Sequence, residues 1–281
     1  MDYYPIWSYH IQNYQSLPAN LTQVTQKLIL SNNIDGKGIR ILLSHYYSNH
    51  DITFYDMSIK INTKTYPLTI HNQNRITLHP QDSIYTDTLP LNINTKDDIE
   101  IIMAIDSQGP INGYVGLNSQ QMITIEHSSQ INCSVLKKDF NKYVYFGIEA
   151  IEIQTDVKPF VIGVFGDSLV HQGYWMNALY KRIYQKYDNV VIYNEGISGN
   201  RLLKDASSTS SLSTIFGQAG ISRFKNDMYK KYQPNLILFA LGINDLVHPG
   251  NGSPLKELPT IEDMINGYKS IINNHLYLCT I

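Results

Sequence analysis

Three short polar stretches, each containing glycine, could together carry out acyl transfer. They are residues 166–169 (GDSL), 194–201 (NEGISGNR) and 242–245 (GIND), and each follows or ends an apolar run. A serine hydroxyl at the end of a strand can attack a carbonyl carbon if hydrogen-bond donors stabilise the oxyanion that develops. Backbone N–H groups beside glycine and the amide of asparagine are suitable donors, because they are neutral dipoles that do not block the substrate.

Each stretch taken alone also has a purely structural explanation. A Gly-Asp-Ser turn is common, and Gly196 and Gly199 could simply be turn residues with positive φ. Asn244 and Asp245 could simply cap the segment that follows them. These explanations do not account for the order of the three stretches at consecutive strand ends, so the combination favours a hydrolytic serine site.

The elements that must position these stretches alternate between strands and helices. Short apolar strands are predicted at residues 160–165, 189–194, 235–241 and 276–281. Continuous apolar strands that alternate with helices predict a parallel sheet covered on both faces, with its ligand beyond the carboxyl ends of the strands. Thr260, with Asp263 three residues later, predicts the start of the last helix. The predicted helical faces are Trp175, Leu179 and Ile183; Ile221, Phe224 and Met228; and Ile261, Met264, Ile265, Tyr268, Ile271 and Ile272.

The first half of the chain has the period-2 pattern of half-buried strands. Residues 35–38 (DGKG) predict a hairpin whose glycines take positive φ. We therefore predict an antiparallel β-sandwich domain over residues 1–156, including a connecting segment at 143–156, and an α/β domain over 157–281. The alternating residues are Ile39, Ile41 and Leu43; Met57, Ile59 and Ile61; and Ile76 and Leu78.

With GDSL, NEGISGNR and GIND in this order, the chain resembles the SGNH/GDSL hydrolases, which are serine esterases and lipases. The resemblance implies a flavodoxin-like, three-layer α/β/α domain. Residues 217–224 (GQAGISRF) and 38–45 (GIRILLSH) resemble a bacterial subgroup with an N-terminal β-sandwich.

The same resemblance implies a role for each matching residue. Ser168 would be the nucleophile and would donate its backbone N–H to the oxyanion. Gly199 would supply a second backbone donor, and Asn244 a side-chain donor. Asp167 belongs to the motif but is not the aspartate of the catalytic triad.

The family's general base is a histidine in a late D-x-x-H block. The sequence ends at Ile281, within the fourth predicted strand, so we expect the triad histidine and aspartate to be absent and the α/β domain to be C-terminally incomplete. Residues 245–248 are the only D-x-x-H in the sequence, and they make His248 a candidate base; the alternative is an exposed loop histidine beside the pocket. His171 is expected at the rim of the pocket.

Composition excludes some partners and gives no indication of others. A net charge of −2 provides no basic surface for nucleic acid. The sequence has no metal motif, P-loop or dinucleotide fingerprint, so we expect no cofactor and no metal. It has no secretory signal and no apolar run of bilayer length, which predicts a soluble, cytoplasmic protein. Cys133 and Cys279 are expected to be structural thiols.

The sequence therefore predicts a carboxylesterase or acetylesterase that acts through an acyl-serine intermediate on small acyl esters, with acylated carbohydrates as candidate substrates. The alternative is a non-catalytic, ligand- or carbohydrate-binding remnant of such an enzyme. A flavodoxin-like cofactor binder is disfavoured because Ser168 and Asn244 suit an oxyanion better than a flavin.

Tyr46 and Tyr47 could stack on sugars, or could reflect the strand propensity of tyrosine. Residues 204–214 could be a solvated connector or a lid. The oligomeric state stays open.

Overall fold

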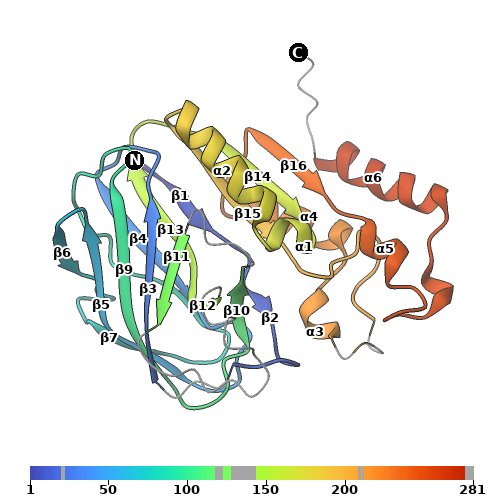
Figure 1. Ribbon diagram of the computed structural model, residues 1–281, viewed down its shortest axis with the longest axis horizontal. Helices are drawn as coiled ribbons and strands as arrows, with labels where there is room; N and C mark the ends of the chain where they lie inside the picture. The colour runs from blue at the N-terminus through green and yellow to red at the C-terminus, as the bar shows by residue number, and fades with distance from the viewer. Residues whose placement is uncertain (20–22, 118–122, 128–143, 208–209, 211, 276–281) are drawn as a thin grey trace.

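The computed structural model describes residues 1–19, 23–117, 123–127, 144–207, 210 and 212–275. Its N-terminal part is antiparallel β structure, and its C-terminal part alternates strands and helices (Figure 1). The N-terminal strands are β1 (Asp2–Ser8), β2 (Gln12–Asn13), β3 (Gln23–Ser31), β4 (Gly38–Ser44), β5 (Ile52–Ile61), β6 (Lys64–Pro67), β7 (Arg75–Leu78), β8 (Ser83–Tyr85), β9 (Asp98–Ser107), β10 (Gly113–Gly116), β11 (Ile123–His127), β12 (Val144–Phe146) and β13 (Ile148–Thr155).

The C-terminal part begins with β14 and ends with a long helix. Cys133, Cys279 and the fourth predicted strand lie outside the described residues, as do three positions of the 204–214 segment. The elements are β14 (Phe160–Gly166), α1 (Ser168–His171), α2 (Tyr174–Lys186), β15 (Val190–Gly196), α3 (Ser213–Phe216), α4 (Gly220–Tyr229), β16 (Leu236–Ala240), α5 (Ile243–Val247), a 3₁₀ turn η2 (Leu255–Glu257) and α6 (Ile261–His275).

The N-terminal strands form three antiparallel sheets. Their orders are β1-β13-β4-β8, β12-β10-β2 and β11-β3-β9-β5-β6, with β7 paired to β5. The predicted apolar residues of β4 and β5 are buried; β5 alternates over most of its length, whereas β4 is buried at every position except Arg40. Side chains from both larger sheets enter one hydrophobic core. The predicted connecting segment instead supplies β12 and β13, and β13 lies between β1 and β4. The sandwich arrangement as such stays a prediction.

The hairpin predicted at residues 35–38 is wrong. The two strands that it was to join, β3 and β4, lie in different sheets, and neither Gly36 nor Gly38 has a positive φ. Gly36 is needed for a close approach instead, because a Cβ at this position would collide with the Ile153 side chain and the Gln154 carbonyl of β13.

The described strands of the C-terminal part form a parallel sheet in the order β15-β14-β16. This order places the first strand between the second and third, and it confirms the predicted strands at 160–165, 189–194 and 235–241. Figure 1 shows α2 and α4 lying against this sheet and α6 beyond β16. A parallel sheet aligns the carboxyl ends of its strands at one edge, which is where the three polar stretches begin.

Alternate residues of β14 meet different helices. Phe165 packs its ring edge-on against Phe224 of α4, with ring centroids 5.0 Å apart. Ile162 belongs instead to the cluster that contains Met176 and Tyr180 of α2. The helices thus pack on opposite faces of the sheet, and Phe224 and Met228 confirm the predicted face of α4.

The predicted face of α2 is confirmed only in part: Leu179 and Ile183 pack against the core cluster, but the fully buried residues lie one position later. Trp175 is 37% exposed, whereas Met176, Tyr180 and Tyr184 are buried. Tyr180 can be buried because its hydroxyl donates a hydrogen bond to the Ile192 carbonyl, at 2.8 Å. Tyr180, whose hydroxyl is hydrogen-bonded, therefore occupies the buried position that the apolar pattern had assigned to Leu179.

The last helix, α6, starts as predicted but buries only part of its predicted face. Thr260 Oγ1 accepts from the Asp263 backbone N–H at 3.1 Å, and Asp263 Oδ2 accepts from the Thr260 backbone N–H at 2.9 Å, which is a capping box. Met264, Tyr268 and Ile271 pack against the core. The other residues of the predicted face, Ile261, Ile265 and Ile272, are exposed.

The two parts of the chain meet along β1 and β15. Tyr9 forms an isolated bridge with Asn194, and the His10 backbone N–H donates to the Asn194 carbonyl at 3.0 Å. The predicted domain boundary at 156/157 falls between β13 and β14 and stays a prediction.

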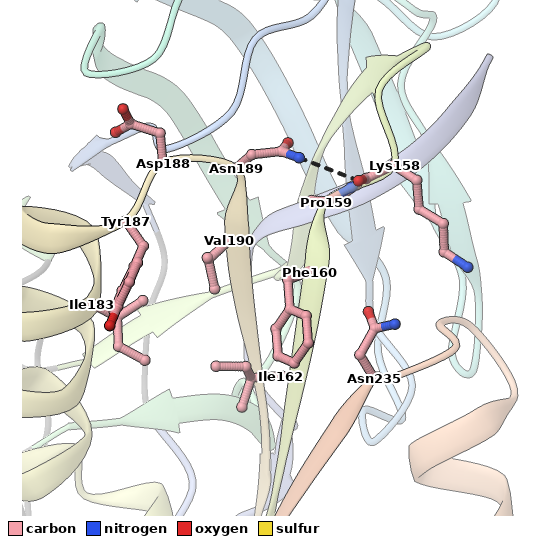
Figure 2. A pocket seen from close by; sticks show the side chains of 10 residues that line it. All are labelled: Lys158, Pro159, Phe160, Ile162, Ile183, Tyr187, Asp188, Asn189, Val190 and Asn235. Carbon is pink, nitrogen blue, oxygen red and sulfur yellow. Dashed lines mark hydrogen bonds between the residues drawn. The ribbon is translucent and has the colours of Figure 1, made fainter. Parts of the chain in front are cut away.

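A cavity of about 660 Å³ opens at the amino ends of the parallel strands. Figure 2 shows Phe160 and Ile162 of β14 beside Ile183 of α2 and Tyr187, which follows this helix. Ser168 follows the carboxyl end of β14, at the opposite edge of the sheet, so this cavity is separate from the polar stretches.

Candidate active site

The three polar stretches begin at one level of the parallel sheet. Gly166 of β14 is in register with Gly196 of β15 on one side and with Ala240 of β16 on the other. A Cβ on Gly166 would collide with the Ala240 carbonyl, so only glycine permits this approach of the strands. The residues that follow this level are therefore brought to the same edge of the sheet.

Ser168 is the first residue of α1 and is half-buried. Asp167 caps this short helix, because its Oδ1 accepts a hydrogen bond from the Leu169 N–H at 2.9 Å. Burial raises the pKa of Asp167. The Asp167 carboxylate thus holds the turn that presents Ser168.

Gly199 has a φ of +76°, a conformation that glycine adopts at little cost. A Cβ here would also collide with the ring of Phe216. The next residue, Asn200, is fully buried, and its Nδ2 donates to the carbonyls of Phe216 and Gln218 at 2.8 and 2.7 Å. The second polar stretch and residues 216–218 are therefore held together as one unit.

Asn244 lies in α5 and joins the third stretch to the second. Its Nδ2 donates one hydrogen bond to the Asn200 carbonyl at 2.9 Å, which leaves its second N–H for another acceptor. Asp245, also buried, accepts from the backbone N–H groups of Leu202 and Leu203 at 2.6 and 2.9 Å. Asn244 and Asp245 thus fix the relative positions of the two loops.

His248 follows α5, and its ring stacks on Phe216 with centroids 4.8 Å apart. Burial lowers the pKa of His248, and the nearby Arg201 guanidinium lowers it further. The Asp245 carboxylate is already bonded to two N–H groups, so it does not orient this imidazole as a triad aspartate would. In the part of the chain that the structure describes, His248 and Ser168 make no hydrogen bond with each other.

The sequence placed His171 at the rim of the pocket, and this prediction is wrong. It is completely buried, its Nδ1 is 3.0 Å from the Gly196 carbonyl, and its ring meets the edge of Tyr9. Burial lowers the pKa of His171 to about 4, so the ring is neutral at pH 7. Its Nε2 has no hydrogen-bond partner among the described residues. The ring therefore lies beside Tyr9 of the N-terminal part of the chain.

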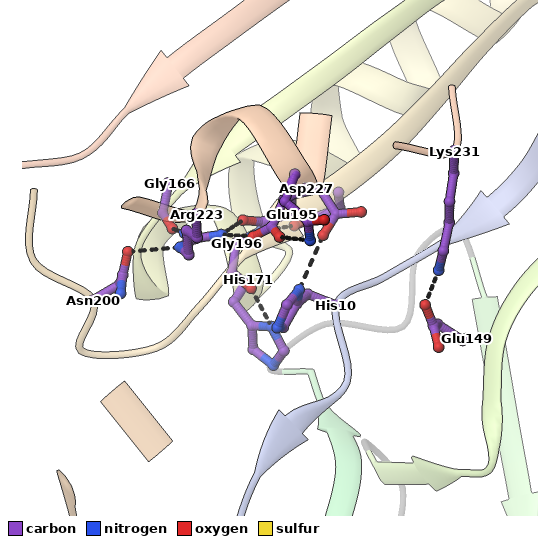
Figure 3. Close-up of polar contacts among 12 residues, drawn as sticks. His10, Glu149, Gly166, His171, Glu195, Gly196, Asn200, Arg223, Asp227 and Lys231 are labelled. Carbon is purple, nitrogen blue, oxygen red and sulfur yellow. Dashed lines mark hydrogen bonds and ion pairs between the residues drawn. The ribbon is translucent and has the colours of Figure 1, made fainter. Parts of the chain in front are cut away.

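Arg223 of α4 ties the strand ends together, as Figure 3 shows. Its guanidinium donates to the carbonyls of Gly166 and Glu195 at 3.0 and 2.9 Å, and to Asn200 Oδ1 at 3.0 Å. It also pairs with Asp227 at 2.8 Å and lies over the Phe165 ring. One buried side chain therefore sets the positions of the first two polar stretches.

Residues 162–279 match the family model described as GDSL-like Lipase/Acylhydrolase. The chain carries a GDSL hydrolase domain. The match is confined to this C-terminal part of the chain.

Among solved structures, the chain is similar to an acetyl xylan esterase (Est2A) from the rumen bacterium Butyrivibrio proteoclasticus. The two share 10% sequence identity with a TM-score of 0.28, over 97% of this chain and 76% of that one. No curated protein matches the chain. None of the helices in the described part of the GDSL chain has the length and apolar character that crossing a bilayer requires.

One group of side chains beside the GDSL domain has the donor types of a metal site. The ligand atoms of His10, Glu195 and Asp227 lie within 4.8 Å of one another, and no other such group occurs among the residues that the structure describes. His10 pairs with Glu195 at 3.0 Å, and Asp227 pairs with Arg223. Because Arg223 already balances Asp227 and its guanidinium opposes a second cation, and because Glu195 is already bonded to His10, we assign no metal here.

Sequence reasoning did not single out His10, Glu195 or Arg223. Arg223 lies within GQAGISRF, which carries part of the family resemblance, so that stretch contained a usable signal. His10 had none, because its partner Glu195 is 185 residues away in the sequence.

Proposed function

We propose that the GDSL domain hydrolyses small acyl esters through an acyl-serine intermediate. Ser168 is the nucleophile. Its own N–H, the Gly199 N–H and the free N–H of Asn244 Nδ2 donate to the oxyanion. The proposal is carried by the common register of the three strand ends, together with the bond from Asn244 to the Asn200 carbonyl.

In the first half of this reaction, Ser168 Oγ bonds to the ester carbonyl carbon while its proton passes to a base. The carbonyl electron pair moves onto oxygen, where the three N–H groups stabilise the negative charge. The intermediate then collapses, the bond to the alcohol oxygen breaks, and the alcohol leaves with the proton from the base. Water repeats the same steps on the acyl-serine and releases the carboxylic acid.

The base is the weak component of this arrangement. His248 is the candidate, but its ring stacks on Phe216, and Asp245 is bonded elsewhere. Loss of a triad histidine lowers kcat by about 10⁶, while oxyanion donors and binding retain about 10³ to 10⁴ over water. We therefore expect very slow turnover of esters by the 281-residue polypeptide.

The nucleophile and the base are tested separately. Because no strong base activates Ser168, we expect a fluorophosphonate to add to it slowly in the native protein, as measured by intact mass and peptide mapping, but not after unfolding in urea. Ser168→Ala is the matched control. A native protein that is labelled no faster than the unfolded one would contradict the nucleophile assignment.

Turnover of p-nitrophenyl acetate tests the base. Hydrolysis at ordinary esterase rates, lost in both Ser168→Ala and His248→Ala, would contradict the slow turnover that we expect. It would show that His248 serves as the base despite its contact with Phe216.

We also propose the finer features of the fold: a β-sandwich before the GDSL domain, and a flavodoxin-like arrangement within it. The order β15-β14-β16 and the helices on both faces support the latter. A non-catalytic carbohydrate-binding role is the second candidate function, and it is favoured by a polar groove between the two parts of the chain.

A further inference from the structure

The outer face of α2 carries positive charge and no negative charge. The helix has 13 residues and contains neither Asp nor Glu, whereas Lys181, Arg182 and Lys186 are all exposed on it. Lys186 lies 5.1 Å from the centre of the Tyr187 ring. Within the part of the chain that the structure describes, none of these three cations pairs with a carboxylate. Their charges are therefore available to a partner.

The acidic residues that flank the helix along the chain do not offset this charge. Asp167 is buried and caps α1. Asp188 is exposed but pairs with Lys96, with its Oδ1 2.9 Å from the lysine Nζ. The helix therefore presents three positive charges that neither of these two neighbours neutralises.

Large apolar side chains are exposed at the start of the same helix. Tyr174 is 63% exposed, and Trp175, which follows it, also reaches solvent. Leu169 of α1 lies just before them in the chain and is 59% exposed. Trp175 and Arg182 are seven residues apart, so they lie on one side of the helix. The face that points away from the sheet therefore combines aromatic rings with cations.

This combination matches the chemistry of an anionic lipid surface. Basic side chains are attracted to anionic headgroups, and tryptophan and tyrosine favour the level at which headgroups meet acyl chains. A helix of this length is about 20 Å long and cannot span a bilayer, but it can lie in the plane of the interface. Its opposite face is buried against the sheet through Met176, Tyr180 and Tyr184, so only the outer face can meet lipid.

We propose that the outer face of α2 docks the protein on an anionic phospholipid bilayer. Tyr174 and Trp175 enter the interface together with Leu169, and the three cations contact headgroup phosphates. This interaction goes beyond the proposed esterase activity and does not depend on whether Ser168 reacts. Because α1 directly precedes α2, docking also brings Ser168 close to the bilayer surface.

Trp175 reports on docking directly, because the other tryptophan of the chain, Trp7, is buried in the hydrophobic core. Native protein is titrated with vesicles of phosphatidylcholine and phosphatidylglycerol in equal parts, and with vesicles of phosphatidylcholine alone. We expect only the anionic vesicles to shift the emission to shorter wavelength and to carry the protein upward in a flotation gradient. Trp175→Phe should lose the shift.

Salt tests the electrostatic part of the interaction. We expect binding at about 0.1 M salt, where the Debye length is about 10 Å, and its loss at about 1 M, where that length is about 3 Å.

Neutralising two of the cations gives the expected magnitude. Each basic residue near an anionic bilayer contributes about fivefold to partitioning, so Lys181→Gln/Arg182→Gln should weaken binding about 25-fold. Lys64→Gln/Lys225→Gln is the matched control, because it removes the same charge from exposed positions on β6 and α4. Its partitioning should stay within about twofold of the wild type. All four side chains are exposed, so neither double variant should fail to fold.

Several results would overturn the proposal. The anionic vesicles could cause neither a shift nor flotation, the neutral vesicles could bind equally well, or Lys181→Gln/Arg182→Gln could partition like its control. An acidic polypeptide is the competing partner: a shift with poly-L-glutamate as large as that with anionic vesicles would show that lipid is not what the helix recognises. A shift that grows with protein concentration in the absence of vesicles would show that a second copy of the chain covers α2 instead.

Discussion

Replacing Arg223 by methionine should destabilise the whole protein, because this side chain bonds to four buried or nearly buried acceptors. Methionine preserves much of the side-chain volume but none of these hydrogen bonds. It leaves the Asp227 carboxylate, which is only 9% exposed, without its partner. Breaking a buried ion pair in this way costs about 3 to 5 kcal/mol. In a protein of this size the loss corresponds to a Tm lower by about 6 to 20 °C.

Thermal unfolding followed by circular dichroism measures this change. Arg182→Met is the matched control, because Arg182 is exposed on α2, and its Tm should stay within about 2 °C of the wild type. The double variant Arg223→Met/Asp227→Leu should be more stable than Arg223→Met alone, since no unpaired carboxylate remains.

Arg223→Lys separates stability from the geometry of the site. Lysine keeps the charge opposite Asp227 but cannot bond at once to the Gly166 carbonyl, the Glu195 carbonyl and Asn200. We expect fluorophosphonate labelling of Ser168 to slow about tenfold, because poorer alignment would raise the activation free energy by roughly 1.4 kcal/mol. The Tm should change much less than in Arg223→Met. The reasoning would be refuted by an Arg223→Met protein that melts with the wild type.

Three further changes test other parts of the structure. Gly199→Ala combines a positive φ with a collision against Phe216, so it should lower the Tm by several degrees and abolish labelling of Ser168; normal labelling would contradict the loop geometry. His171 has a pKa near 4 when folded and 6.5 as its ordinary value, so the unfolded chain binds more protons in between. The free energy of unfolding should rise by about 3 kcal/mol from pH 4 to 6.5, and urea titrations of His171→Gln should lack that rise. Thr260→Ala removes the capping box with Asp263 and should cost about 1 kcal/mol in urea unfolding, whereas an unchanged midpoint would show that the box contributes nothing.

The strand ends and their polar residues were predictable because they depend on local patterns. A continuous apolar run followed by glycine and a polar residue defines a buried parallel strand and its end, and this placed Ser168, Gly199 and Asn244 at one edge. The Thr260 capping box is local in the same way. These features need only a few adjacent residues to be recognised.

Features that depend on distant backbone were not predictable. Arg223 bonds mainly to carbonyl oxygens, which every residue carries and which leave no trace in the sequence. The prediction that Gly36 lies in a hairpin turn was wrong for the same reason. Glycine is needed at this position because β13, more than a hundred positions later in the chain, approaches it closely. On α2, the apolar pattern missed Tyr180 because its burial depends on a carbonyl acceptor in β15.

The contacts between the chain's beginning and the GDSL domain have a consequence for folding during synthesis. His10 and Gln12 bond to Glu195 and to the Ile215 carbonyl, which lie 185 and 203 residues later. At about 5 to 20 residues per second, the ribosome completes these partners roughly 10 to 40 s after the first strands emerge. For most of that interval β1 lacks both β13, with which it pairs, and β15, and a chaperone that recognises an unpaired strand has time to bind there. The contacts that join the two parts of the chain are therefore among the last features of the molecule to form.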